Sequence, residues 1–540
     1  MNFSGPISMP RDSSKLGAGS SVQKPNVLLL YPKTGQDYGS TVAPPHALIT
    51  IAAPVLKSGY SVEIIDQRTQ LVNKDVLRNL ISSDLFCVGI STMTGLQVRY
   101  ALGIARMVRE LTDGNVPIVW GGCHPSVMPD QTLANENVDI VVVGEGDDSF
   151  LEIIKALENK ESLENIQGII YKNGSEVGGI PYRPLMNVED LLPTPWELID
   201  VENYIHRDIY LRGRDRVLDL GQTSRGCPFD CGFCSSASIR GRKWRAMTVE
   251  KSLEMIIGGV DKFNLDGFWL RDDEFYIKRK RAHAIFEGII ESEFDVKFYT
   301  SGTRADVLLK ARDEEYEVMK RAGIHSMKIG AESGSQRILD LMQKGLTVEQ
   351  TIEANLRCKQ YGMAPIFSLM IGYPTETFEE MDMTIDMAFR LRKDNPMAQT
   401  ETMSQFTALP GTPDFELAKR NGIKVPEKLE DWCDWFQDSY DFEGARSPWY
   451  SKKERIYLGN ISYMSQLSSA FENLMGTGRN KFLAAILQKG ARVIGKIYRS
   501  WLRNKKYKFR PELKIVQYLR RKIFELPTEP SLKIWSKYRA

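Results

Sequence analysis

Three cysteines within eight residues constrain this chain more than any other feature of its sequence. They stand in Cys227-Pro-Phe-Asp-Cys231-Gly-Phe-Cys234, directly after the segment 222–226. A segment this short can fold back as a loop that points three sulfurs at one centre. Thiolates are soft ligands, so the loop suits either zinc or an iron–sulfur cluster.

A zinc knuckle is the structural alternative to a cluster. Zinc in a structural site normally takes four protein ligands. No fourth ligand lies nearby, because the next Cys downstream is Cys358 and the nearest His residues are His206 and His283. Three thiolates on a four-iron cluster would leave one iron open for a substrate-like ligand. The sequence therefore favours a cluster over zinc.

The C-x3-C-x2-C spacing, with Phe233 just before the last Cys and a predicted strand before the loop, resembles the radical SAM superfamily. The resemblance implies that Cys227, Cys231 and Cys234 hold a [4Fe-4S] cluster. Its open iron would bind the amino and carboxylate groups of S-adenosylmethionine (SAM), and the reduced cluster would cleave SAM. An external electron donor such as flavodoxin or ferredoxin is then expected.

Length and composition favour a multi-domain protein of the cytoplasm. A chain of 540 residues predicts about three domains, at roughly 150 residues each. Seven Cys, three of them clustered, form no disulfide framework and suit a reducing compartment. Residues 1–24 are rich in Ser, Gly and Pro and predict disorder without a leader-like apolar region. The sequence contains no apolar run of about 18 residues, so no transmembrane helix is predicted.

Residues 25–160 alternate between short apolar runs and helical patterns. This order predicts a doubly wound, Rossmann-like parallel sheet, in which ligands lie at the carboxyl ends of the strands. The region resembles the cobalamin-binding domain that precedes the radical SAM domain in one large class, through Pro44-Pro45-His46, Gly121-Gly-Cys-His124-Pro and Gly144-Glu-Gly-Asp147. The cobalamin contacts that follow are Ser91, Gly121, Gly122, His124, Gly144, Glu145 and Gly146.

Two alternatives stay open for this region. The Asp-x-His-x-x-Gly box of other cobalamin proteins is absent, so the resemblance implies no His ligand to cobalt. A flavodoxin-like domain that binds nothing is the alternative for the whole region. His124, at a strand end, can also simply cap a loop.

Residues 161–212 predict a linker with one hairpin across Asn173-Gly174, and residues 213–420 predict six strand–helix units. Six such units fit the partial (βα)6 barrel of radical SAM enzymes, whose catalytic groups gather at strand carboxyl ends. The predicted SAM contacts are Phe233, Asp272, Ser301, Arg304, Glu332 and Gly372. Asp272 and its neighbour Asp273 have an alternative role as caps of the next helix.

Residues 421–540 predict a mainly helical, basic domain. Residues 479–540 carry 18 Lys and Arg against 3 Asp and Glu, a balance of +15. A basic amphipathic helix over 481–503 suits an anionic membrane surface, and a solvated basic face is the plain alternative. Nucleic acid is not expected, because no recognisable binding motif is present.

The first functional hypothesis is a cobalamin-dependent radical SAM enzyme that methylates an unactivated carbon of a small, hydrophobic or lipid-like substrate. The resemblance also covers an anaerobic porphyrin cyclase, so oxidative cyclisation or rearrangement is the second hypothesis. A non-enzymatic B12 or redox sensor is the third.

Overall fold

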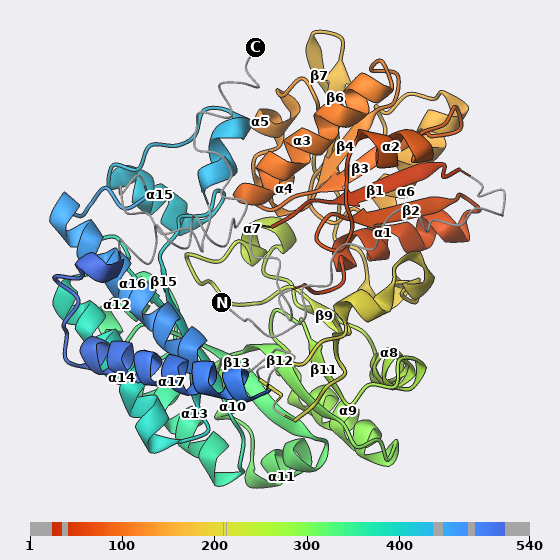
Figure 1. Cartoon of the computed structure of the whole chain (residues 1–540). Helices are drawn as coiled ribbons and strands as arrows, with labels where there is room; N and C mark the ends of the chain where they lie inside the picture. The colour runs from red at the N-terminus through yellow and green to blue at the C-terminus, as the bar shows by residue number, and fades with distance from the viewer. Residues whose placement is uncertain are drawn as a thin grey trace.

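The structure of the protein is a computed structural model that describes residues 24–34, 42–208, 210–211, 213–435, 446–472 and 481–513. An N-terminal sheet with its helices, a central half-barrel and a C-terminal group of helices lie side by side (Figure 1). This arrangement confirms the predicted α/β fold class. The segment predicted to be disordered, residues 1–24, lies outside the described residues except for Lys24.

The N-terminal sheet has seven strands in the order β2-β1-β3-β4-β5-β6-β7, and the first five in the chain are parallel. Its strands are β1 (Val27–Tyr31), β2 (Val62–Asp66), β3 (Cys87–Ser91), β4 (Ile118–Gly121), β5 (Ile140–Val142), β6 (Ile169–Asn173) and β7 (Glu176–Ile180). Buried Val, Ile and Leu fill the parallel strands, as expected for strands covered on both faces.

Helices cover both faces of this sheet. They are α1 (His46–Lys57), α2 (Lys74–Leu80), α3 (Leu96–Leu111), α4 (Cys123–Val127), α5 (Pro129–Leu133) and α6 (Asp147–Asn159). Gly59 follows the end of α1 with φ +92°, the left-handed conformation that ends helices.

The hairpin predicted across Asn173-Gly174 is present as β6 and β7, but it belongs to the sheet rather than to a free linker. β6 pairs antiparallel with β5, and Gly174 adopts φ +62° in the turn. The sheet therefore continues past the predicted boundary at residue 160. Three short 3-10 helices follow, at Val188–Asp190 (η3), Trp196–Leu198 (η4) and Val201–Tyr204 (η5).

The central sheet has six parallel strands in the order β15-β14-β13-β12-β11-β8, as the predicted six-unit barrel requires. The strands are β8 (Val217–Asp219), β11 (Gly267–Leu270), β12 (Lys297–Thr303), β13 (Ile324–Glu332), β14 (Ile366–Ile371) and β15 (Gln399–Gln405). The covering helices are α8 (Val249–Lys262), α9 (Arg279–Glu291), α10 (Ala305–Leu308), α11 (Asp313–Arg321), α12 (Gln336–Leu341), α13 (Val348–Gln360) and α14 (Phe378–Asp394). β8 and β15 are not paired with each other, so the barrel is open.

The C-terminal part joins the two sheets. It comprises α15 (Pro413–Arg420), η6 (Leu429–Asp434), α16 (Lys452–Glu472) and α17 (Lys481–Arg503), which confirms the predicted helical character. Ser465 Oγ of α16 accepts from Met403 N of edge strand β15 at 3.0 Å, and Ser462 Oγ donates to Met403 O at 2.7 Å. α16 thus satisfies backbone groups that an open sheet edge would leave unpaired.

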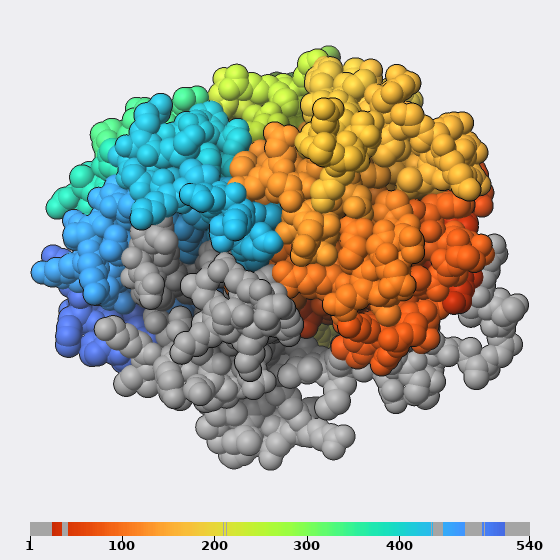
Figure 2. Space-filling view, turned by 90° about the horizontal axis from the view of Figure 1, so that it is seen from above, coloured from red at the N-terminus to blue at the C-terminus, as the bar shows by residue number. Residues whose placement is uncertain are grey.

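The segment η6 packs against the N-terminal domain. Trp432 is fully buried, lies edge-on to His124 with ring centroids 5.4 Å apart, and donates to Gln131. Figure 2 shows these C-terminal residues (cyan) in contact with the N-terminal domain (orange). No helix among the described residues is long and apolar enough to cross a membrane.

Candidate cluster and cofactor site

The three cysteines lie in a loop that follows the carboxyl end of the first barrel strand, β8, and is braced by a small ribbon. The ribbon consists of β9 (Ser224–Arg225) and β10 (Arg245–Ala246), paired antiparallel, with α7 (Ser236–Arg240) between them. Gly226 adopts φ +84°, and a Cβ there would lie 2.3 Å from Lys243 O. Both observations explain why this position is a glycine. Sequence patterns missed this ribbon, because two-residue strands carry no periodicity.

Backbone contacts hold the loop from several sides. Gly232 N donates to Met342 O at 2.8 Å, and Asp414 N donates to Gly232 O at 3.0 Å. A Cβ on Gly232 would lie 2.5 Å from Asp414 Oδ1, so glycine is required for this approach. Cys227, Cys231 and Cys234 are free and half-buried, and they are therefore accessible to a metal cluster.

Asp272 and Asp273 fasten the start of the loop. The Asp272 carboxylate is buried and accepts from Thr223 Oγ1 at 2.9 Å and from Ser224 Oγ. Asp273 Oδ2 accepts from Gly226 N at 2.9 Å and from Arg240 Nη1 at 3.0 Å.

The alternative role of the two aspartates as helix caps was wrong, because the next helix, α9, has Lys278 at its N-cap. Burial raises the pKa of Asp272, and its hydroxyl partners oppose that shift. The structure thus places Asp272 behind the segment that leads into the cysteine loop, where its carboxylate holds Thr223 and Ser224.

Two cations lie beside the loop. Arg304 Nη1 lies 3.6 Å from Cys231 Sγ, while the rest of its guanidinium bonds to Asp306 at 2.9 Å and to Lys344 O at 2.7 Å. Its Cζ also lies 3.8 Å from the centre of the Phe229 ring. A cation at this place would offset the negative charge of thiolates bound to a cluster.

Lys344 forms a buried ion pair with Glu332, with Nζ and Oε1 2.8 Å apart. Burial lowers the pKa of Lys344, but Glu332 and Cys231 outweigh burial and leave it raised. Lys344 Nζ also lies 5.6 Å from the centre of the Phe233 ring, so the pair stands at the loop. Glu332 adopts φ +60° at the end of β13, where the register to β14 shifts. Backbone strain of this kind concentrates at functional sites.

The donor set fits an iron–sulfur cluster. An open pocket of about 490 Å³ adjoins the loop and is lined by Pro228, Phe229, Asp230, Arg304, Asp340, Gln343, Lys344 and Gly345. Burial raises the pKa of Cys227 to about 12, so the free residue is a thiol and metal binding must release its proton. Among the described residues, no three His, Cys, Asp or Glu converge on a single metal-ion position. A cluster needs no such convergence, since each Cys binds a different iron.

Ser301 and Gly372 complete the predicted SAM contacts. Ser301 Oγ lies 3.4 Å from Asp272 O at the end of β12. Gly372 adopts φ +82°, and Leu458 of α16 occupies the space where its Cβ would lie. The missing Cβ of Gly372 therefore also lets α16 pack against the end of β14, and Gly372 stays a predicted SAM contact.

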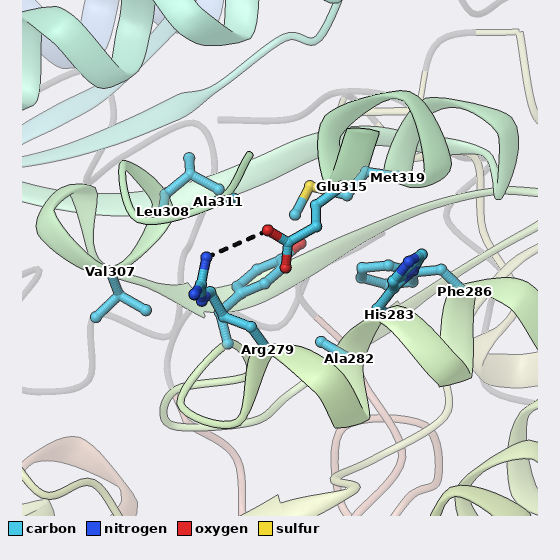
Figure 3. Close-up of a pocket in the computed structure, with 10 residues that line it drawn as sticks. Arg279, Ala282, His283, Phe286, Val307, Leu308, Ala311, Glu315 and Met319 are labelled. Carbon is cyan, nitrogen blue, oxygen red and sulfur yellow. Dashed lines mark hydrogen bonds and ion pairs between the residues drawn. The ribbon is translucent and has the colours of Figure 1, made fainter. Parts of the chain in front are cut away.

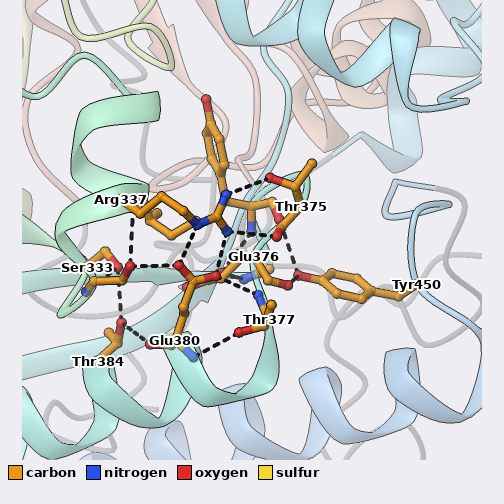
Figure 4. Close-up of polar contacts among 12 residues, drawn as sticks. Ser333, Arg337, Thr375, Glu376, Thr377, Glu380, Thr384 and Tyr450 are labelled. Carbon is orange, nitrogen blue, oxygen red and sulfur yellow. Dashed lines mark hydrogen bonds and ion pairs between the residues drawn. The ribbon is translucent and has the colours of Figure 1, made fainter.

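A polar network follows Gly372 (Figure 4). Glu376 Oε2 accepts from Gly372 N at 2.5 Å and from Tyr373 N at 3.0 Å, while Tyr450 Oη donates to Glu376 O at 2.7 Å. Arg337 and Glu380 form an ion pair of 2.6 Å beside it. Burial raises the pKa of Glu376 to about 8. The network joins the fifth barrel strand to the C-terminal helices.

The pocket in Figure 3 lies elsewhere, between the outer helices α9, α10 and α11. It encloses about 10 Å³, and the Arg279–Glu315 ion pair crosses it. A space of this size holds about one water molecule, so this pocket is no cofactor site.

The predicted cobalamin contacts gather at one edge of the N-terminal sheet. Gly122 adopts φ +98°, and a Cβ there would lie 2.6 Å from Thr92 O and 3.0 Å from Ser91 Oγ. Ser91 and Gly121 are paired in register on β3 and β4. This close approach of two strand ends explains the glycine at Gly122.

His124 is fully buried in this edge. Its Nδ1 lies 3.0 Å from Thr94 Oγ1, its ring contacts Trp432, and burial lowers its pKa to about 4. A neutral imidazole packed in this way supports the structural alternative for His124.

The Gly144-Glu-Gly-Asp147 segment meets the cluster loop directly. Asp147 forms two hydrogen bonds to Arg225, at 2.9 and 3.1 Å, and Glu145 forms two to Arg245, at 2.9 and 2.7 Å. Arg225 also lies 3.6 Å from Glu145. We call these four side chains the interdomain charge cluster. Arg225 stands two residues before Cys227, so the interdomain charge cluster ties the cysteine loop to the N-terminal sheet.

The half-barrel interior holds a second polar group, which the sequence predictions did not include. Trp269 and Tyr299 stack with centroids 5.4 Å apart, and Arg271 lies 4.7 Å from the Trp269 ring centre. Lys328 and Glu401 form an ion pair of 2.7 Å, and Tyr210 Oη donates to Glu401 at 3.0 Å. Charged residues at alternate positions of buried strands were the signal that could have indicated these inward-facing side chains.

Comparison with known proteins agrees with this geometry. The radical SAM superfamily matches residues 222–388, and the B12-binding domain family matches residues 40–154. An uncharacterised methyltransferase of Pyrococcus horikoshii is 31% identical over 389 residues, which cover 71% of this chain and 80% of that protein. The anaerobic magnesium-protoporphyrin IX monomethyl ester cyclase of Cereibacter sphaeroides is 25% identical over 379 residues, covering 69% of this chain and 60% of the cyclase.

Among solved structures, the cobalamin-dependent radical enzyme OxsB, with aqua-cobalamin and SAM bound, is similar with a TM-score of 0.69 at 20% identity. The match covers 92% of this chain and 75% of OxsB. The two domain matches confirm the predicted cofactors, a [4Fe-4S] cluster with SAM and a cobalamin, and they do not support the zinc, flavodoxin-like or sensor alternatives. This chain belongs to the radical SAM superfamily, as an enzyme of the class that carries a B12-binding domain.

Proposed function

We propose that this enzyme transfers a methyl group to an unactivated carbon of a hydrophobic or lipid-like substrate. One observation supports the joint use of both cofactors: Arg225, beside the cysteine loop, pairs with Asp147 at the strand ends predicted to bind cobalamin. The two predicted cofactor sites therefore adjoin each other. Reactive chemistry of this kind belongs to the bound cofactors, and the protein supplies binding and orientation.

The protein's own residues have separable tasks in this proposal. Cys227, Cys231 and Cys234 hold the cluster, and Arg304 and the Lys344–Glu332 pair balance charge beside it. Phe233, Ser301 and Gly372 remain predicted SAM contacts, and Ser91, Gly121, Gly122, Gly144 and Gly146 remain predicted cobalamin contacts. We assign Asp272 and Glu145 positioning roles, because their carboxylates already bind Thr223 and Arg245.

The hydrophobic substrate class is supported by side chains of the half-barrel interior. The Trp269 and Tyr299 rings stack there, and the charges of Lys328 and Glu401 cancel in an ion pair. A largely apolar molecule with a small polar end fits such a surface. An external electron donor and a peripheral contact with the cytoplasmic membrane face belong to the same proposal.

The test is anaerobic incubation of the reconstituted enzyme with SAM carrying a deuterated methyl group, cobalamin and a lipid extract. The proposal predicts 5′-deoxyadenosine together with a product that has gained one methyl group bearing the label. A product that has lost hydrogen without gaining carbon would instead establish cyclisation. Cleavage of SAM without any modified product in the lipid fraction would contradict the substrate class.

A further inference from the structure

Helix α17 presents an uncommon outer face. It packs against α16 and α14 through buried Tyr498 and Leu502, and its opposite side faces solvent on the outside of the molecule (Figure 1). Two different kinds of side chain line that outer side.

The first kind is apolar. Val493, Ile494 and Ile497 are 57%, 43% and 40% exposed. Spacings of three and four residues bring them onto one side of the helix, where they form a continuous surface. We call these three residues the apolar stripe.

The second kind is basic. Lys489, Arg492, Lys496 and Arg503 are exposed and lie at spacings of three, four and seven residues, so they form a parallel row, the basic stripe. The sequence has no Asp or Glu from residue 481 to residue 511. Arg499 instead faces α14, where burial, together with Arg392, lowers its pKa to about 9.

The side-by-side stripes indicate the kind of surface that covers this face. Water gives three exposed aliphatic side chains no favourable contact, and a nucleic acid backbone offers them no apolar surface. An anionic bilayer accepts both, because aliphatic chains enter the acyl boundary while Lys and Arg reach the headgroups. Phe509, which is 80% exposed and follows the exposed Lys508, repeats the combination just beyond the helix.

We propose that α17 lies in the interfacial plane of a membrane containing anionic lipid, with the apolar stripe inserted and the basic stripe on the headgroups. The inference rests on the proposed membrane contact and adds the surface that makes it. Docking there would keep the enzyme at the bilayer from which a lipid-like substrate comes.

Flotation of the full chain with lipid vesicles tests this inference. We expect binding to phosphatidylcholine vesicles that contain phosphatidylglycerol, and little binding to phosphatidylcholine alone. Lys489→Gln/Lys496→Gln should weaken partitioning onto the anionic vesicles about 30-fold, from about 1 kcal/mol per cation. Val493→Ser/Ile497→Ser should weaken it more than tenfold, because inserted methyl groups are lost.

Matched changes elsewhere serve as controls. Lys57→Gln/Lys155→Gln and Val177→Ser alter exposed residues of the N-terminal domain and should leave vesicle binding unchanged. Binding that responds to the Lys pair but not to the Val–Ile pair would overturn insertion, as would binding lost equally to competing RNA. Absence of binding to anionic vesicles would overturn the inference outright.

The same variants separate this inference from the proposed function. Measured with detergent-dispersed substrate, their SAM cleavage and methyl transfer should equal those of the unaltered enzyme. Vesicle binding without methyl transfer by the unaltered enzyme would contradict the function and leave the docking surface standing.

Discussion

The interdomain charge cluster yields the sharpest prediction about stability. In Asp147→Ala, Arg225 loses both of its short hydrogen bonds to a carboxylate. Its remaining charged partner is Glu145, which lies 3.6 Å away and is already bound to Arg245. The Arg225 and Asp147 side chains are only 10% and 9% exposed, so water screens the pair weakly. Removing one partner of a buried pair costs about 3–5 kcal/mol, and the remaining Glu145 places this case near the lower end, about 3 kcal/mol.

A matched control lies on the same helix. Glu152 of α6 also makes two hydrogen bonds to an arginine, Arg183, at 2.8 and 2.7 Å, but its side chain is 42% exposed. Exposed pairs contribute about 0–1 kcal/mol, so Glu152→Ala should cost little. The hydrogen-bond distances are similar in the two pairs, and the pairs differ in the burial of their side chains.

Thermal unfolding of the anaerobic protein measures the contrast. At about 2–4 °C per kcal/mol for a domain of this size, Asp147→Ala should lower the apparent Tm by roughly 6–12 °C and Glu152→Ala by less than about 4 °C. Asp147→Ala should also raise the ratio of 5′-deoxyadenosine to methylated product, because the cysteine loop is no longer held to the N-terminal sheet. Equal Tm losses for the two variants would show that burial does not strengthen the Arg225–Asp147 pair.

Two further predictions concern the barrel. Burial raises the pKa of Glu376 to about 8, so the folded state keeps a proton that the unfolded state loses near pH 4.5, and folding stability falls as pH rises between those values. The Tm of Glu376→Gln should therefore exceed that of the unaltered protein at pH 8 and equal it at pH 4. A Tm difference that does not change with pH would contradict this prediction. The Lys328 and Glu401 side chains are 33% and 24% exposed, so Lys328→Met should lower the Tm by only about 2–4 °C. If the half-barrel interior binds the substrate, Lys328→Met should reduce methyl transfer more than SAM cleavage. Equal losses of both activities would contradict a role of this interior in substrate binding.

The sequence predicted the elements of this fold well, because each domain repeats one strong pattern. The alternation predicted over 25–160 and the six strand–helix units predicted over 213–420 correspond to real strands, such as β2 and β14. Apolar runs bounded by glycine and proline are an unambiguous signal for buried parallel strands.

Partners across the fold could not be predicted in the same way. Glu145 was assigned to cobalamin from its strand-end motif, yet its carboxylate binds Arg245, which lies 100 residues away in the sequence. Asp272 was correctly placed at a barrel strand end, but its side chain turns toward Thr223. Periodicity fixes where a residue stands along a strand, whereas the choice of a charged partner depends on the three-dimensional contact between domains.

Cys227, Cys231 and Cys234 are expected to hold a cluster with one open iron, and iron and sulfide analysis after anaerobic reconstitution tests this assignment. About four iron and four sulfide per chain are expected. The reduced cluster should also give an electron paramagnetic resonance signal that changes when SAM is added. The variant in which all three residues are serine should bind neither iron nor sulfide, while Cys358→Ser, a buried helix thiol, should bind both in full. A full cluster in the triple-serine variant, or none in the unaltered protein, would contradict the account.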